Sequence, residues 1–436
     1  MSEVAFVRRC VFLLLLICVA SSAWPQSSPP TPQIPTTITA STSPSKAAPL
    51  TLAQVLDLAH RSNPSLLAGA QHLSAVRAQE ITAGLRQNPV GAVTGQMVTL
   101  LPSNPNGPDF YSVGVSRLFE RGNKREFRLE NARSTTSLTS FQLDDQRRQT
   151  DLAIRQAFSR MLYAQGALNI SRENLEGYQK TVDLMKVRLD AGDIDRTDFD
   201  RIELQLAGFQ SDLANAELTL KQGSIALQTL LGIATPSDNF AITGSLAPPP
   251  EMLTLDDLRN SALANRPDLK AAQAQIDTNV AAAKLAKANG TADPTIEGEY
   301  ERSGDANTFG GNINIPLRIF DRNQGEKQRT AYELESSRLA YTAARNQVLS
   351  DVDSAWAGYQ TAVAEDALYR NKYLAEAAHV RDNLEFSYRN GNSTLLDYLS
   401  ALSDYRQVNL ASLNAQLQLL LSIEQLSYVT QTEILP

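Results

Sequence analysis

The most regular feature of the sequence is an apolar residue at every seventh position along two neighbouring stretches. In residues 124–190 these positions hold Ile154, Met161, Leu168, Leu175, Val182 and Leu189. In residues 196–231 they hold Phe199, Leu206, Leu213, Leu220 and Leu227. This repeat keeps one seam of a helix against a partner helix. We therefore predict two long helices that pack together, the first about 65 residues and roughly 100 Å long.

The second half of the chain repeats the first. Asn63-Pro64-Ser65-Leu66 returns as Arg266-Pro267-Asp268-Leu269, and the turn glycine Gly192 returns as Gly391. Ordered matches of this kind indicate a duplication. Each half predicts a first helix, a pair of short strands, a very long helix and its returning partner. The predicted first helices are Leu52–Gln87 and Leu255–Asn289, and the very long ones are Lys124–Asp190 and Gly325–Asn390.

The N-terminus has the pattern of a secretory signal peptide. A charged stretch precedes an apolar run of about ten residues, which is far shorter than the about 20 that a transmembrane helix needs. We place the signal at residues 1–23, with cleavage after Ala23. The other predicted parts are a Pro/Ser/Thr-rich linker (24–49), a first structural repeat (50–245), an inter-repeat linker (246–253) and a second structural repeat (254–436).

Both cysteines, Cys10 and Cys18, fall inside the predicted signal. The mature chain would therefore have no disulfide and no thiol chemistry. Two other interpretations of this segment stay open. Arg8 and Arg9 would suit a twin-arginine signal, and Cys18 would suit lipidation, although Ile17 stands where a lipobox has a small residue.

Alternating apolar and polar residues predict the strands, Thr295–Arg302 and Phe309–Leu317 in the second half. The apolar face would carry Ile296, Tyr300, Ile313 and Ile315, with Tyr111, Val113 and Val115 in the first half. The polar face would carry Glu297, Glu299, Glu301, Asn312 and Asn314. A soluble sheet with one wet face is one interpretation. The other is a membrane β-barrel whose lumen the polar face lines. Four strands cannot close a barrel, so several chains would share it.

Composition and motifs exclude several function classes. The net charge of −7 and the pI near 5.2 argue against a nucleic-acid partner. The sequence has no phosphate-binding glycine loop, no zinc-protease helix motif and no Cys/His cluster. Its three histidines, His60, His72 and His379, are scattered. We therefore expect no enzyme activity, no cofactor and no resident metal.

Aspartates crowd the turn between the first pair of long helices. Asp193, Asp195, Asp198 and Asp200 all lie there, and Asp397 follows the matching turn at Gly391. These carboxylates could cap the helices and complement their dipoles. In an oligomer whose turns converge they could instead form a ring that favours cations. Both interpretations stay open.

Together these features resemble the TolC-like outer-membrane efflux proteins, over about Leu50 to Leu435. Two segments carry the resemblance beside the duplication: Ile315–Gly325 at a strand-to-helix junction, and the paired turns at Gly192 and Gly391. The junction and Phe119–Arg125 are closest to the heavy-metal branch of the family. The resemblance implies a mainly α fold with a β-barrel portion. In a homotrimer, long antiparallel hairpins would form an α-barrel, and four strands per chain would join a shared 12-stranded transmembrane β-barrel.

The resemblance also implies a place and partners. The chain would be the outer-membrane exit duct of a tripartite pump in a Gram-negative bacterium, with a large periplasmic portion and outer-membrane lipid around its barrel. A periplasmic adaptor and an inner-membrane pump of the resistance-nodulation-division type would supply the rest. The rival hypothesis is a soluble periplasmic coiled-coil scaffold or adaptor. Adaptors carry one hairpin, whereas this sequence predicts two equivalent ones.

Family residues that hold the periplasmic aperture closed match two positions here, Tyr388 and Asp397. The family's best-known branch also has an arginine two residues after the second turn glycine, where this chain has Ser393. We therefore expect other donors in the closing network. The predicted gate and tip residues are Tyr388, Asp397, Asp198, Asp195, Arg196 and Arg389, with Arg188 as a further donor.

Overall fold

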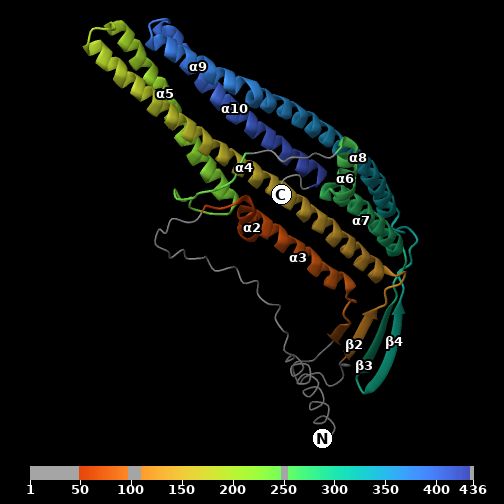
Figure 1. The fold of residues 1–436 in the computed structure, drawn as a ribbon. Coiled ribbons are helices and arrows are strands. Elements are labelled where there is room, and N and C mark those ends of the chain that lie inside the picture. Colours follow the sequence, from red (N-terminus) through yellow and green to blue (C-terminus); the bar gives the residue numbers. More distant parts are fainter. Residues whose placement is uncertain (1–48, 97–109, 247–253, 433–436) are drawn as a thin grey trace, which may run out of the picture. The chain divides into compact units, whose positions relative to one another are not determined.

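The computed structural model describes residues 49–96, 110–246 and 254–432. The predicted signal peptide and nearly all of the Pro/Ser/Thr-rich linker lie outside these ranges, as does most of the inter-repeat linker. In the described ranges the fold is mainly helical with one small antiparallel sheet (Figure 1). The predicted mix of long helices and short strands is therefore confirmed.

The two halves contain the same order of elements. The first half has α2 (Leu52–Ser62), α3 (Pro64–Gly84), β1 (Val90–Gln96), β2 (Phe110–Leu118), α4 (Lys124–Asp190) and α5 (Arg196–Leu230). The second half has α6 (Leu255–Asn265), α7 (Pro267–Asn289), β3 (Thr295–Ser303), β4 (Ala306–Asn314), α8 (Gln324–Leu368), the π-helical turn η1 (Tyr369–Tyr373), α9 (Leu374–Arg389) and α10 (Leu395–Thr430).

Four predicted elements differ from the structure, for local backbone reasons. Each predicted first helix is two helices, broken before Pro64 and Pro267, because a proline disfavours helical geometry at the residue before it. The predicted strand Phe309–Leu317 lies earlier, at β4, since Pro316 has no N–H for the ladder. The second very long helix contains η1, which sequence periodicity does not reveal.

The seven-residue repeat forms the core between α4 and α5. Ile154 and Met161 of α4 and Leu227 of α5 are fully or almost fully buried, together with Val55 of α2. The second half has the corresponding cluster, in which Leu258, Val348, Val352 and Leu426 come from α6, α8 and α10. The hairpins are thus held together along their length, which positions the turns at their ends.

The sheet joins the two halves of the chain. Its order is β1-β2-β3-β4 with antiparallel pairing throughout, so β2 of the first half pairs with β3 of the second. The register places Val93, Val113, Tyr300 and Phe309 in one cross-strand row. Residues opposite each other in antiparallel strands share a face. Most apolar positions of the four strands therefore lie on this face, which we call the apolar face, whereas Val90, Phe110 and Leu118 lie on the other.

A buried carboxyl group lies in the seam between α4 and α10. The Glu424 side chain is on α10, and the whole residue is only 2 % exposed. One of its oxygens accepts a hydrogen bond of 2.5 Å from Ser159 Oγ of α4. The other oxygen has no hydrogen-bond partner among the residues that the structure describes. Burial raises the pKa of Glu424 to about 7, against the opposing effect of the Ser159 hydrogen bond, Arg155 and Arg160.

This pKa predicts that the seam is most stable in acid. The pKa of Glu424 in the folded protein exceeds the usual value of 4.5. Its contribution to stability is therefore complete below pH 4.5 and is lost as the pH rises through about 7. The loss amounts to about 3 kcal/mol per chain. The midpoint temperature of thermal unfolding should therefore decrease as the pH is raised from 5 to 8. Glu424→Gln should flatten this dependence, whereas Glu203→Gln on the exposed face of α5 should keep it; an unchanged slope in Glu424→Gln would contradict the assignment.

Candidate functional site at the hairpin tips

Two turns with the same geometry end the long hairpins. Gly192 and Gly391 have φ values of +81° and +74°, the left-handed region that residues with a Cβ avoid. The amide of Asp193 donates back to the Arg188 carbonyl, and the amide of Asn392 donates to the Ser387 carbonyl, both at 2.8 Å. These bonds satisfy the last carbonyls of α4 and α9. The duplication predicted from the sequence therefore extends to the turn backbone.

The aspartates at the tips cap helices within this chain. Asp195 accepts the Asp198 amide at 2.8 Å at the start of α5. Asp397 and Thr394 form a capping box at the start of α10, in which the Thr394 hydroxyl donates to Asp397 Oδ2 at 2.7 Å. This bond holds the pKa of Asp397 below its usual value. The capping geometry expected from the sequence is present at Asp195 and Asp397.

The arginines predicted for the gate pair within their own helices. Arg196 lies 2.8 Å from Asp200 of α5, and Arg389 pairs with Glu385 of α9. Asp198 lies 3.9 Å from Arg201, also on α5. Among the residues that the structure describes, no ion pair of these side chains crosses from one hairpin to the other. One chain by itself therefore does not bring the predicted aspartates and arginines into a single network.

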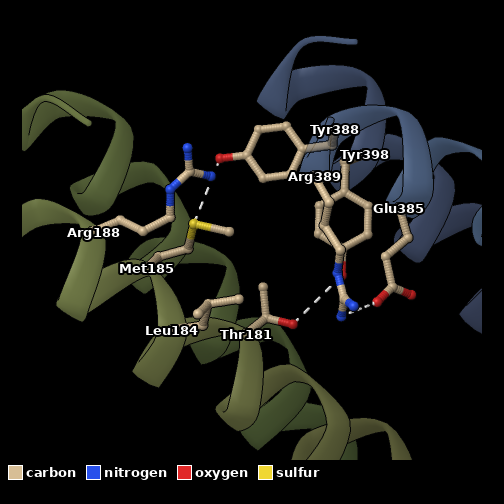
Figure 2. A pocket seen from close by; sticks show the side chains of 8 residues that line it. All are labelled: Thr181, Leu184, Met185, Arg188, Glu385, Tyr388, Arg389 and Tyr398. Carbon is tan, nitrogen blue, oxygen red and sulfur yellow. Dashed lines mark hydrogen bonds and ion pairs between the residues drawn. The ribbon is translucent and has the colours of Figure 1, made fainter. Parts of the chain in front are cut away.

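The two hairpins meet instead around Tyr388. Its ring stacks on Tyr398 of the same hairpin, with a centroid distance of 5.5 Å and an angle of 5°. The Arg188 guanidinium of α4 lies 5.7 Å from the Tyr388 ring centre, and the Tyr388 hydroxyl donates to Met185 Sδ at 3.5 Å. Figure 2 shows these side chains facing one another across a pocket of about 330 Å³. Burial raises the pKa of Tyr388, so the hydroxyl stays neutral.

Sequence reasoning missed the burial of Tyr398 beneath this contact. The Tyr398 hydroxyl lies 3.5 Å from Thr181 Oγ1 of α4, and the residue is buried. Tyr178 stacks on Phe209 at 4.4 Å and donates to the Ile202 carbonyl at 2.9 Å. Tyr398 follows Asp397, in the place that Phe199 has in the first repeat. That match could have marked it as a buried tip residue.

The polar residues predicted for the barrel share one face of the sheet. Glu297 lies opposite Asn312, and Asn314 lies opposite Thr295. Glu299 and Glu301 alternate with Gly298 and Tyr300 on the same strand, so they join that face. The predicted facing of these side chains agrees with the register. In the described ranges, no cluster of His, Cys, Asp or Glu has the geometry of a metal site.

Comparison with known proteins identifies the family. The family described as "Outer membrane efflux protein" matches residues 55–233 and 258–430, most of the chain. The chain belongs to this family, which is one of transport ducts rather than enzymes. It is an outer-membrane channel of an efflux system, and the soluble-scaffold alternative is not favoured. Within the described ranges, no helix is both long enough and apolar enough to cross a membrane.

Individual relatives agree with this assignment. The cobalt-zinc-cadmium resistance protein CzcC of Cupriavidus metallidurans is 26 % identical over 362 residues, which cover 81 % of this chain and 84 % of CzcC. A membrane protein from Pseudomonas aeruginosa has the same fold, with a TM-score of 0.75, 18 % identity and coverage of 87 % and 93 % of the two chains. The channel protein CusC has a TM-score of 0.73 at 18 % identity, with coverage of 87 % and 91 %.

Proposed function

We propose that three copies of this chain form one continuous duct, and that each copy gives its four strands to a shared 12-stranded barrel. The inverted exposure of the inner strand β2 carries this proposal. On its apolar face Val113 is 51 % exposed and Val115 is 57 % exposed, whereas Ser112 on its polar face is 3 % exposed. Such an arrangement is unfavourable in water and favourable in lipid around a polar lumen.

The edges of the sheet support the same assembly. In the described part of the chain, β1 and β4 each pair with a strand on one side only. An exposed strand edge offers unpaired N–H and C=O groups to another chain. Pairing of β1 from one copy with β4 from the next would satisfy these groups around a ring. The proposed units of each copy are the repeats 50–245 and 254–436, joined by 246–253, after removal of the signal at 1–23 and with 24–49 as a linker.

A cation is the proposed cargo. Glu297, Glu299 and Glu301 follow one another along the polar face of β3, and Asn312 lies beside them. Three copies would repeat this row of carboxylates around the lumen, and rings of Asp or Glu favour cations. The name of CzcC, a cobalt-zinc-cadmium resistance protein, supports the same class of cargo.

The helical hairpins form the periplasmic part of the proposed duct. Their tips would dock a periplasmic adaptor, which connects the duct to an inner-membrane pump of the resistance-nodulation-division type. We propose Tyr388 and Arg188 as the contact that keeps the two hairpins of one chain together at the closed aperture. Asp195, Asp198, Asp397, Arg196 and Arg389 would surround it at the tips and act between neighbouring copies.

Fractionation of cells tests this function. The mature protein should be recovered in the outer membrane, need detergent for extraction, and run as an oligomer that dissociates on heating. Burial of the apolar sheet face in lipid is the physical reason. A soluble periplasmic monomer would contradict the proposed function and favour the scaffold alternative.

A further inference from the structure

A basic pocket lies at the strand-to-helix junction of the first repeat, apart from the proposed lumen and gate. It has a volume of about 480 Å³ and is lined by residues 86–87 and 117–126. Its lining includes the exposed residues Arg86, Arg117 and Arg121. None of these three guanidinium groups forms an ion pair with any other residue in the described ranges. Arg117 lies over the Phe119 ring, 5.2 Å from its centre.

The other charges around this pocket are largely compensated. Glu120 forms an ion pair with Arg128, whose Nη2 lies 3.1 Å from Glu120 Oε2. Lys124 is buried and donates to Asp293 Oδ2 at 2.5 Å. Glu126 is the remaining acidic side chain in the lining. Arg125 is a fourth lining arginine without an ion pair to any described residue, and its Nε donates to the Gly84 carbonyl at 2.5 Å. Four such arginines against one carboxylate leave the pocket positive, so its ligand should be an anion.

Exposed apolar side chains lie at the same end of the sheet. Phe119 follows β2, and Leu317 and Phe320 follow β4, where they are 78 % and 90 % exposed. The ladder places Arg117 opposite Ile296, which in turn lies opposite Ile313. The apolar sheet face thus continues up to the basic pocket. A protein at a bilayer surface places apolar side chains against the acyl chains and positive side chains at the level of the headgroups, and this end of the sheet has that arrangement.

We propose that this pocket binds the phosphate headgroup of an anionic phospholipid in the periplasmic leaflet of the outer membrane. Arg86, Arg117 and Arg121 hold the phosphate, and Phe119 lies against the first part of the acyl chains. The corresponding apolar residues Leu317 and Phe320 enter the same leaflet. The inference rests on the proposed function, because it needs the apolar sheet face in lipid.

Lipid retention measures this site directly. The full chain is extracted in detergent, inserted into vesicles of equal parts phosphatidylglycerol and phosphatidylcholine, and released for native mass spectrometry. Each arginine near a membrane surface contributes roughly fivefold to the preference for an anionic lipid. We expect at least roughly tenfold preference for phosphatidylglycerol in the wild type. The triple variant Arg86→Gln/Arg117→Gln/Arg121→Gln should lose it, to within roughly twofold of no preference.

Control variants and competitors separate the possible outcomes. Arg345→Gln removes an exposed arginine of α8, roughly 30 Å along that helix from its start, and should retain the wild-type preference. Arg86→Gln/Arg121→Gln changes no strand residue, so it can be measured even if the triple variant fails to insert. It should show a reduced preference for phosphatidylglycerol. Undiminished preference in either arginine-depleted variant, or displacement of the lipid by excess inorganic phosphate, would overturn the inference. A wild-type protein that conducts but retains both lipids equally overturns this site alone, whereas one that never inserts overturns the proposed function.

Discussion

Phe309→Arg should prevent assembly in the outer membrane, whereas Asn312→Arg should not. Phe309 lies near the middle of β4 on the apolar face, opposite Tyr300, and Asn312 lies on the polar face, opposite Glu297. An arginine facing lipid at the bilayer midplane costs roughly 2–4 kcal/mol, and the cost arises once in each of the three proposed copies. Heat-modifiable oligomer in outer-membrane fractions is the measurement.

The loss of oligomer should depend on where along the strand the arginine is placed. Ile313 shares the apolar face but lies one residue from the end of β4, where the cost of an arginine falls to roughly 0–1 kcal/mol. Ile313→Arg should therefore reduce the amount of oligomer less than Phe309→Arg. Asn312→Arg should insert normally and change the conductance, because it adds positive charge beside Glu297. Equal tolerance of arginine at Phe309 and Asn312 would refute the proposed facing of the sheet.

Tyr388→Ala combined with Arg188→Gln should open the closed channel. The variant removes the contacts of Tyr388 with Arg188 and Met185, which join the two hairpins near their tips. It also removes the Tyr388–Tyr398 stack, which holds α9 to α10 inside the second hairpin. An exposed cation–π contact is worth roughly 0.5–1 kcal/mol. Three copies therefore lose roughly 1.5–3 kcal/mol of contact energy between hairpins, which should raise single-channel conductance in planar bilayers. Oligomer yield should stay normal, because the core between α4 and α5 is unchanged.

Matched variants distinguish a gate from ordinary helix capping. Arg389→Ser removes only the ion pair with Glu385 inside α9 within one chain, so its conductance should rise little unless Arg389 acts between copies. Asp397→Ala removes the half of the capping box in which Asp397 accepts the Thr394 amide, while the Thr394 side chain still caps α10. It should cost at most about 1 kcal/mol of stability per chain. Wild-type conductance in the Tyr388/Arg188 double variant would show that these residues only pack the tips.

Periodicity predicted the parts of this fold that repeat along one element. Ile154 and Leu227 are buried because a seven-residue step returns to the same side of a helix. Glu297 and Glu299 share a face because strands alternate with period two. The turns at Gly192 and Gly391 followed from residue type, since glycine tolerates positive φ.

The missed features depend on contacts between distant parts of the chain or on local backbone geometry. The pairing of β2 with β3 joins the two halves, and sequence alternation within each strand cannot specify it. The Tyr388–Tyr398 stack beside Met185 requires α4, α9 and α10 to meet, which no single-helix pattern encodes. The π-helical turn Tyr369–Tyr373 inserts into a helix without a proline or glycine to mark it.

Cross-linking of β1 to β4 between copies tests the shared barrel most directly. Both native cysteines fall in the predicted signal, so cleavage after Ala23 would leave no competing thiol. A cysteine at Val93 on β1 would be combined, in separate variants, with one at Phe309, Gly311 or Ile313 on β4, all on the apolar face. Oxidation of outer membranes should give covalent dimers and trimers for at least one of these pairs and no larger species. Monomers alone from every pair, in protein that has reached the outer membrane, would contradict a barrel built by three chains.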